Sequence, residues 1–274
     1  MCKSLDSLTF PEVEALVAAG AWLAVPLGST EQHGAHLPLS TDSDVALALC
    51  ARLATARDDV LVAPIVPYGS SGEHAGFAGT LSIGQQATEL VVLELGRSAF
   101  ETFDRVLFVS AHGGNARPVS RAVRTLRSES RDVSLFYPKW DGDLHAGHVE
   151  TSMQLALDPA RVHLDRAVVG DIRPLPELLP LLQDNGVRAV TATGVLGDPT
   201  RASGAAGTAE LDRITADLIA HVSAWLTAPA SGPDHHLPAS EIPPPSIPPS
   251  VINRPETLDI NGSGLLINEG GTSE

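Results

Sequence analysis

Carboxylate and imidazole side chains recur in three short groups along the first 150 residues of the chain. The first group holds Glu31, His33 and Asp42, the second is built around His112, and the third ends at Glu150. These side chains offer oxygen and nitrogen ligands without a thiolate, a set that suits Zn, Mn or Fe(II). Asp42 has two carboxylate oxygens with which it could bridge two ions. The residue types therefore favour a hydrolase that uses two metal ions.

Each group also has an ordinary structural interpretation. The first could be a polar loop in which Asp42 caps a helix, and the second a tight turn capped by Asn115. The third, which also contains His145 and His148, could be a helix N-terminus with Glu150 in its first turn. Three such coincidences, each downstream of a predicted strand, are improbable together, so we favour the chemical interpretation.

The elements that would position these groups alternate between strands and helices. Short apolar runs rich in β-branched or aromatic residues predict buried strands at residues 21–27, 60–66, 106–110 and 133–137. Helical patterns cover residues 43–55, 85–103, 117–128, 150–157, 175–183 and 208–226. This order predicts an α/β fold, a three-layer α/β/α sandwich with a mostly parallel central sheet. Ligands of such sheets bind beyond the carboxyl ends of the strands, where the three groups fall.

A fourth polar segment, residues 67–82, follows the second predicted strand. It is rich in glycine and carries Glu73 and His74, which suits a substrate-binding loop but equally an ordinary surface loop. Trp140 and His148 are further candidates for substrate contact, since both lie beside the third group. The only cysteine within a helical pattern, Cys50, is expected to be a buried structural thiol.

Composition excludes several classes of function. The formal net charge of −15 disfavours binding to nucleic acid or to an anionic membrane surface. Two cysteines cannot build a disulfide framework, and neither a membrane span nor a signal peptide is recognisable, so we expect a cytoplasmic protein. The dinucleotide, P-loop and nucleophile-elbow motifs are missing from the sequence.

Composition also divides the chain. Residues 229–274 are rich in Pro, Ser and Gly, carry more acids than bases, and cannot bury enough apolar area to offset the entropy of ordering. We therefore expect one folded metallohydrolase domain over residues 1–228 and a disordered tail over residues 229–274.

The combination of residues 25–34, Asp42, residues 112–115 and the third group resembles the creatininase family of metal-dependent amidohydrolases. The resemblance covers about residues 20–225. Segments 72–74, 77–84, 145–148 and 194–199 look most like one branch of that family, the peptidases of mycofactocin maturation. Those enzymes release the modified C-terminal Val-Tyr dipeptide from a ribosomally made precursor peptide. The resemblance thus implies a peptide substrate, two divalent metal ions (Zn, Fe or Mn) and a symmetric homo-oligomer, with a hexamer as the expected form.

The resemblance also implies roles for the metal ligands. Glu31 and His112 would bind one ion, His33 would bind the other, and Asp42 would bridge them. Creatininases proper have a glutamate for the second ion at the position that Gly114 occupies here.

Glu150 is the natural replacement for this missing ligand, because it follows a neighbouring strand. His145 matches the proton-shuttling histidine of the family.

Classical creatininases close tryptophans over a flat cyclic substrate, and this chain offers only Trp140 near the site, which disfavours creatinine. Two other functions remain open: hydrolysis of creatinine or another small cyclic or N-formyl amide, and a non-catalytic metal-binding scaffold.

Overall fold

A single parallel sheet forms the centre of the protein in the computed structural model, which describes residues 3–139 and 142–228. Its strands follow the order β1-β3-β2-β4-β5, and every paired neighbour runs parallel. The predicted parallel sheet is therefore confirmed. The strands are β1 (Lys3–Ser4), β2 (Trp22–Leu27), β3 (Val60–Val62), β4 (Arg105–Ser110) and β5 (Asp132–Phe136).

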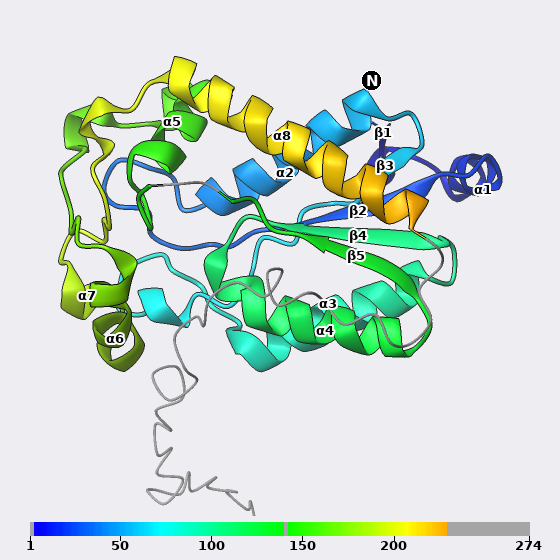
Figure 1. Cartoon of the computed structure of the whole chain (residues 1–274), viewed down its shortest axis with the longest axis horizontal. Coiled ribbons are helices and arrows are strands. Elements are labelled where there is room, and N and C mark those ends of the chain that lie inside the picture. Colours follow the sequence, from blue (N-terminus) through cyan, green and yellow to red (C-terminus); the bar gives the residue numbers. More distant parts are fainter. Residues whose placement is uncertain (1–2, 140–141, 229–274) are drawn as a thin grey trace, which may run out of the picture.

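Helices cover both faces of this sheet, with α2 and α8 on one side and α3 and α4 on the other (Figure 1). Helices α6 and α7 lie side by side at one end of the molecule, and α5 packs against α8 near the same end (Figure 1). The predicted three-layer α/β/α sandwich is confirmed. The helices are α1 (Phe10–Ala18), α2 (Thr41–Ala56), α3 (Gly84–Ala99), α4 (Ala116–Ser128), α5 (His148–Leu157), α6 (Leu175–Asn185), α7 (Val187–Val190) and α8 (Gly204–Thr227).

The central strand β2 divides the apolar core in two. Trp22 and Ala24 pack with α2, α5 and α8, whereas Leu23 and Val25 pack with α3 and α4. Successive side chains of a strand point to opposite faces, so a continuous apolar run fills both layers. Cys50 is buried within the first layer, as its helical position predicted.

Some element boundaries differ from the predicted ones. Strand β3 ends at Val62 instead of residue 66, because Pro64 has no N–H to donate to a ladder. Helix α3 ends at Ala99, four residues before its predicted end. The N-cap of α2 is Ser40, so Asp42 lies inside the first turn of that helix and does not cap it.

Two elements near the N-terminus were not predicted. Strand β1 has only two residues and no alternating pattern. Helix α1 begins with a capping box, in which Glu12 accepts a hydrogen bond from the backbone N–H of Thr9 at 2.7 Å. This S/T-x-x-E pattern was a readable start signal.

Strand order places the ends of β2 and β4 beside each other at a topological switch point. The chain leaves β2 for β3 on one side and later returns to β4 on the other side of β2. The loops after β2 and β4 therefore diverge from adjacent strand ends, the position where α/β sheets bind ligands.

No helix among residues 3–139 and 142–228 is long and apolar enough to cross a membrane. The predicted tail, residues 229–274, lies outside the described residues.

Candidate metal centre

Five predicted ligands meet at the carboxyl ends of β2 and β4. Glu31 and His33 stand in the loop after β2, Asp42 in the first turn of α2, His112 directly after β4, and Glu150 in the first turn of α5. Each is at most 7% exposed. Together with His145, they offer ligand atoms in three groups that could each hold a metal ion: Glu31, Asp42 and His112; His33, Asp42 and Glu150; and Glu31, His33 and His145.

The first group is centred on His112, whose two ring nitrogens face two carboxylates. Its Nε2 lies 3.3 Å from Glu31 Oε2, and its Nδ1 lies 3.2 Å from Asp42 Oδ2. The hydroxyl of Ser29 donates a hydrogen bond to the same Asp42 oxygen at 2.6 Å. This group therefore rests on the ends of two adjacent strands and on the helix that follows one of them.

The second group uses the other oxygen of Asp42. His33 Nε2 lies 3.4 Å from Asp42 Oδ1. Glu150 completes the group, and its carboxylate accepts the backbone N–H of Ala146. Because Asp42 turns one oxygen toward each group, its side chain has the placement that a bridging ligand requires.

The position of Gly114 has no room for the glutamate of creatininases proper. A Cβ atom there would lie 2.0 Å from the backbone oxygen of Ser70 and 2.5 Å from Glu73 Oε1. Glu73 itself approaches His112 Nε2 at 3.9 Å. The carboxylates near this position therefore come from other segments of the chain.

His145 and His74 lie against the ligand groups. The ring of His145 packs between those of His33 and His74, with centroid distances of 4.3 Å on either side. His74 Nε2 lies 3.4 Å from Glu31 Oε1. The segment 67–82 therefore contacts the ligand groups through His74. The substrate-binding roles of Glu73 and His74 stay predictions.

Two further predicted substrate contacts are not part of this arrangement. His148 begins α5, is half-buried, and belongs to none of the ligand groups that the described residues form. Trp140 lies outside the described residues.

One residue of the centre was overlooked at the sequence level. Gln32 is 5% exposed and contacts both His74 and His145 through its amide nitrogen, at 2.8 and 3.0 Å. Its place between two predicted ligands, Glu31 and His33, was the available signal.

The pKa values of the buried groups depend on two opposing effects: burial disfavours the charged form of each group, and attraction between opposite charges favours it. Burial raises the pKa of Glu31 to about 8 and that of Glu150 to about 7. Burial alone would also raise the pKa of Asp42, but His33 and His112 hold it well below its usual range. Burial lowers the pKa of His145 far below its ordinary value, so this imidazole is neutral.

The donor set fits a pair of divalent cations. Glu31 Oε2 and His33 Nε2 are buried and make no hydrogen bond within the described part of the chain. A buried polar atom without a partner is costly, and a cation in each of the two groups that share Asp42 would satisfy one of these atoms. Imidazole and carboxylate donors are the ligands of Zn, Mn and Fe(II).

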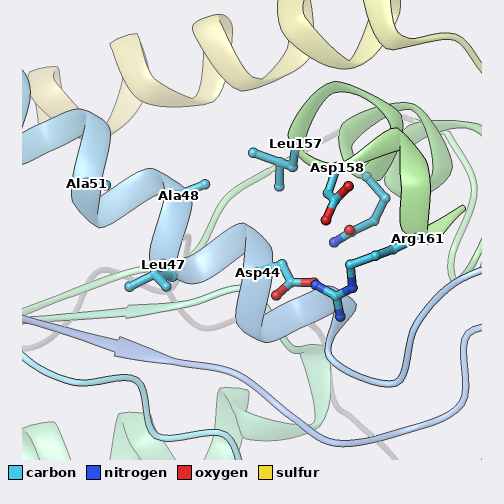
Figure 2. Close-up of a pocket in the computed structure, with 8 residues that line it drawn as sticks. Asp44, Leu47, Ala48, Ala51, Leu157, Asp158 and Arg161 are labelled. Atoms are coloured by element: carbon cyan, nitrogen blue, oxygen red, sulfur yellow. The ribbon is translucent and has the colours of Figure 1, made fainter.

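A separate pocket of about 250 Å³ lies outside this centre, between α2 and the end of α5 (Figure 2). Arg161 Nη1 pairs there with Asp44 Oδ2 at 2.9 Å. Two residues along a helix correspond to about 200° of rotation, so Asp44 faces away from Asp42. The lining residues, none of which is a predicted ligand, are Asp44, Leu47, Ala48, Ala51, Gln154, Leu157, Asp158 and Arg161.

Comparison with known proteins gives consistent matches. A protein-family profile described as "Creatininase: Creatinine amidohydrolase" matches residues 6–222. A protein of Mycobacterium tuberculosis named mycofactocin precursor peptide peptidase is 45% identical over 76% of this chain and 86% of its own length. The protein of the same name from Mycolicibacterium smegmatis is 48% identical over 71% of this chain and 80% of its own length.

Solved creatininase structures share the fold. A tryptophan-to-alanine mutant creatininase superposes with a TM-score of 0.73 at 26% identity, covering 83% of this chain and all of the other. Two further creatininases at 25% identity are described as a zinc–zinc type and a manganese form.

Proposed function

The chain belongs to the creatininase family of amidohydrolases, and from this premise we propose that it is the metal-dependent peptidase that releases the modified C-terminal Val-Tyr dipeptide from the mycofactocin precursor peptide. The observation that carries this proposal is the 45% identity to a named mycofactocin precursor peptide peptidase over 86% of that protein's length. The creatinine amidohydrolase of Pseudomonas putida is a weaker match, 33% identical over 61% of this chain, which favours the peptidase over creatinine hydrolysis.

The metal centre would be held by the five buried ligands, with Asp42 shared between two divalent ions (Zn, Fe or Mn). Such ions supply Lewis acidity and lower the pKa of a water molecule to near neutrality. Glu31, His33, His112 and Glu150 supply the remaining donors. Their burial keeps bulk water away, which strengthens the attraction between each carboxylate and a cation.

His145 would carry the proton from the attacking water to the leaving nitrogen. Its Nε2 lies 2.8 Å from the backbone oxygen of Gln32, so this nitrogen is already engaged. Its Nδ1 is directed toward Glu31 Oε1, at 3.9 Å, and faces the ligands. Amide hydrolysis needs a protonated leaving nitrogen, because an amine departs poorly as an anion, and Nδ1 is placed to deliver that proton.

Three further features belong to this proposal. The folded hydrolase domain comprises residues 1–228, and residues 229–274 form a tail. The protein works as a homo-oligomer, with a hexamer as the expected form, in the cytoplasm.

The test is mass spectrometry of a precursor peptide that ends in the modified Val-Tyr, incubated with the metal-loaded full chain. We expect metal-dependent loss of the dipeptide and none in a chelated control. Creatinine and a formamidopyrimidine are offered in parallel reactions, and we expect neither to be hydrolysed at a comparable rate.

A His145→Gln variant is the matched comparison in this assay. We expect its turnover to fall about 10²–10⁴-fold while it retains the metal content of the wild type, because it loses only proton transfer. Hydrolysis of creatinine or the formyl substrate without peptide cleavage would move the assignment to a small-amide hydrolase. No hydrolysis of any substrate by a fully metal-loaded chain would favour the non-catalytic scaffold.

A further inference from the structure

The side-chain amide of Gln32 has one orientation that its surroundings allow. Its Oε1 accepts the backbone N–H of Gly34 at 2.8 Å, and its Nε2 donates to the backbone oxygen of Gly194 at 3.1 Å. Rotating the amide by half a turn would set two donors against each other at Gly34 and two acceptors at Gly194. Both neighbours are backbone groups with fixed roles, so the nitrogen of Gln32 must face the histidines.

This orientation determines which nitrogen of His74 carries its proton. His74 Nδ1 lies 2.8 Å from the amide nitrogen of Gln32, which can only donate. His74 Nδ1 therefore accepts, and the proton of the neutral ring is on Nε2. That Nε2–H points to Glu31 Oε1 at 3.4 Å and can orient this carboxylate.

The backbone of Gln32 determines the tautomer of His145 in the same way. His145 Nε2 lies 2.8 Å from the carbonyl oxygen of Gln32, which can only accept. No backbone N–H in the described residues bonds to this oxygen. The amide nitrogen of Gln32 is farther away, at 3.0 Å, and its two hydrogens already go to His74 and Gly194. His145 therefore carries its proton on Nε2 and leaves Nδ1 bare.

Residues 194–197 hold this arrangement from the other side. Gly194 approaches so closely that a Cβ atom there would lie 1.9 Å from Gln32 Oε1, and its φ of +79° also favours glycine. Leu196 pairs with the backbone of His145, accepting its N–H at 3.2 Å and donating to its oxygen at 2.9 Å. The same segment thus fixes both the amide of Gln32 and the backbone of His145.

We propose that Gln32 is a positioning residue that sets the tautomers of both histidines, its side chain acting on His74 and its carbonyl on His145. The consequence for catalysis rests on the proposed function. In the resting enzyme, Nδ1 of His145 is a proton acceptor. It takes a proton from the attacking water as that O–H bond breaks and the oxygen bonds to the carbonyl carbon, and it returns the proton to the amide nitrogen as the C–N bond breaks.

The first test needs no substitution and no substrate. Long-range ¹H–¹⁵N correlation spectra of the ¹⁵N-histidine-labelled, metal-free full chain report which ring nitrogen is protonated. We expect His74 and His145 both to be neutral with the proton on Nε2. An Nδ1–H tautomer at either histidine in the wild type would overturn the proposal.

A Gln32→Glu variant tests whether the side-chain amide of Gln32 sets the tautomer of His74. A carboxylate cannot donate, so we expect the proton of His74 to move to Nδ1 while His145, held by the carbonyl, keeps its Nε2–H. Gln154→Glu is the matched control, because Gln154 is also buried but donates to the backbone oxygen of Thr41. Its spectrum should match the wild type at both histidines, and an unchanged His74 in Gln32→Glu would refute the assignment.

Gly194→Ala provides a second route should Gln32→Glu not fold. The added methyl displaces the Gln32 amide, and we expect the His74 signals to lose their single-tautomer pattern.

Turnover of the metal-loaded Gln32→Glu variant should fall about 10–100-fold, the usual cost of losing a group that orients a ligand. The spectra are read without peptide, so they can succeed even if the peptide-cleavage assay fails, and the two outcomes are separable.

Discussion

The two ligand groups that share Asp42 are built in different ways. The group with Glu31 and His112 draws on the ends of the adjacent strands β2 and β4, whose register is fixed by five residue pairs. The group with His33 and Glu150 needs α5, which follows β5 only after residues 137–147 and reaches the centre by packing on α2 and α8. The two strand ends and the start of α2 are thus enough to place the first group, whereas the second also depends on the packing of α5.

This difference bears on where a carboxylate for the second group can stand. Around Gly114, space is limited by the backbone of Ser70, so no side chain fits. Glu150 stands on a helix start, and its carboxylate is held by the N–H of Ala146. The helix α5 thus brings a carboxylate to the edge where the loop after β4 has none, and its role as a ligand stays a prediction.

The largest effect is expected from Asp42→Ala, which removes the residue common to both groups. Metal content should fall from about two ions per chain to none, because each ion loses a ligand and would keep only two. Elemental analysis measures the ions, and circular dichroism controls for folding. A folded variant that still held two ions would show that Asp42 does not bridge.

Substitution of one ligand in only one of the two groups should remove one ion and leave the other. Glu31→Gln and Glu150→Gln keep side-chain size but remove one charged ligand, so each variant should retain about one ion per chain. Elemental analysis and titration with zinc provide the measurement.

Glu73→Gln is the matched control for these two variants. Glu73 lies beside His112 with its side chain 13% exposed but belongs to none of the three ligand groups, so this variant should keep the full complement of ions. Full metal content in Glu150→Gln would remove Glu150 from the second group.

The smallest effect concerns the space around Gly114. Gly114→Ala should lower the free energy of unfolding by about 1–3 kcal/mol, because the new methyl group collides with the Ser70 carbonyl. Gly113→Ala is the control, since a Cβ atom there meets nothing within 4 Å. Denaturant unfolding of the metal-free proteins compares the two. Equal stabilities would mean that the loop after β4 can accept a side chain, and that packing does not explain the glycine.

Much of the centre could be predicted from the sequence because its ligands are close to strand ends. Glu31, His33 and His112 each follow a strand that is recognisable from its apolar run, and parallel strands bring their carboxyl ends to one edge. Strand β1 could not be predicted in this way, since a strand of two residues is too short to show an alternating pattern. The end of β3 could have been predicted from Pro64, because proline cannot donate a hydrogen bond to a neighbouring strand.

The sequence by itself determined the parallel sheet, the order of its layers and the chemical type of the candidate metal ligands, because these follow from local periodicity and residue type. Only the tertiary structure decided that Asp42 turns one oxygen to each group, that His74 is buried against Glu31, and that Gln32 faces two histidines. Those placements depend on contacts between segments far apart in the chain, such as Gln32 with Gly194. Side-chain orientation across such distances is fixed by packing and hydrogen-bond satisfaction, which no local pattern encodes.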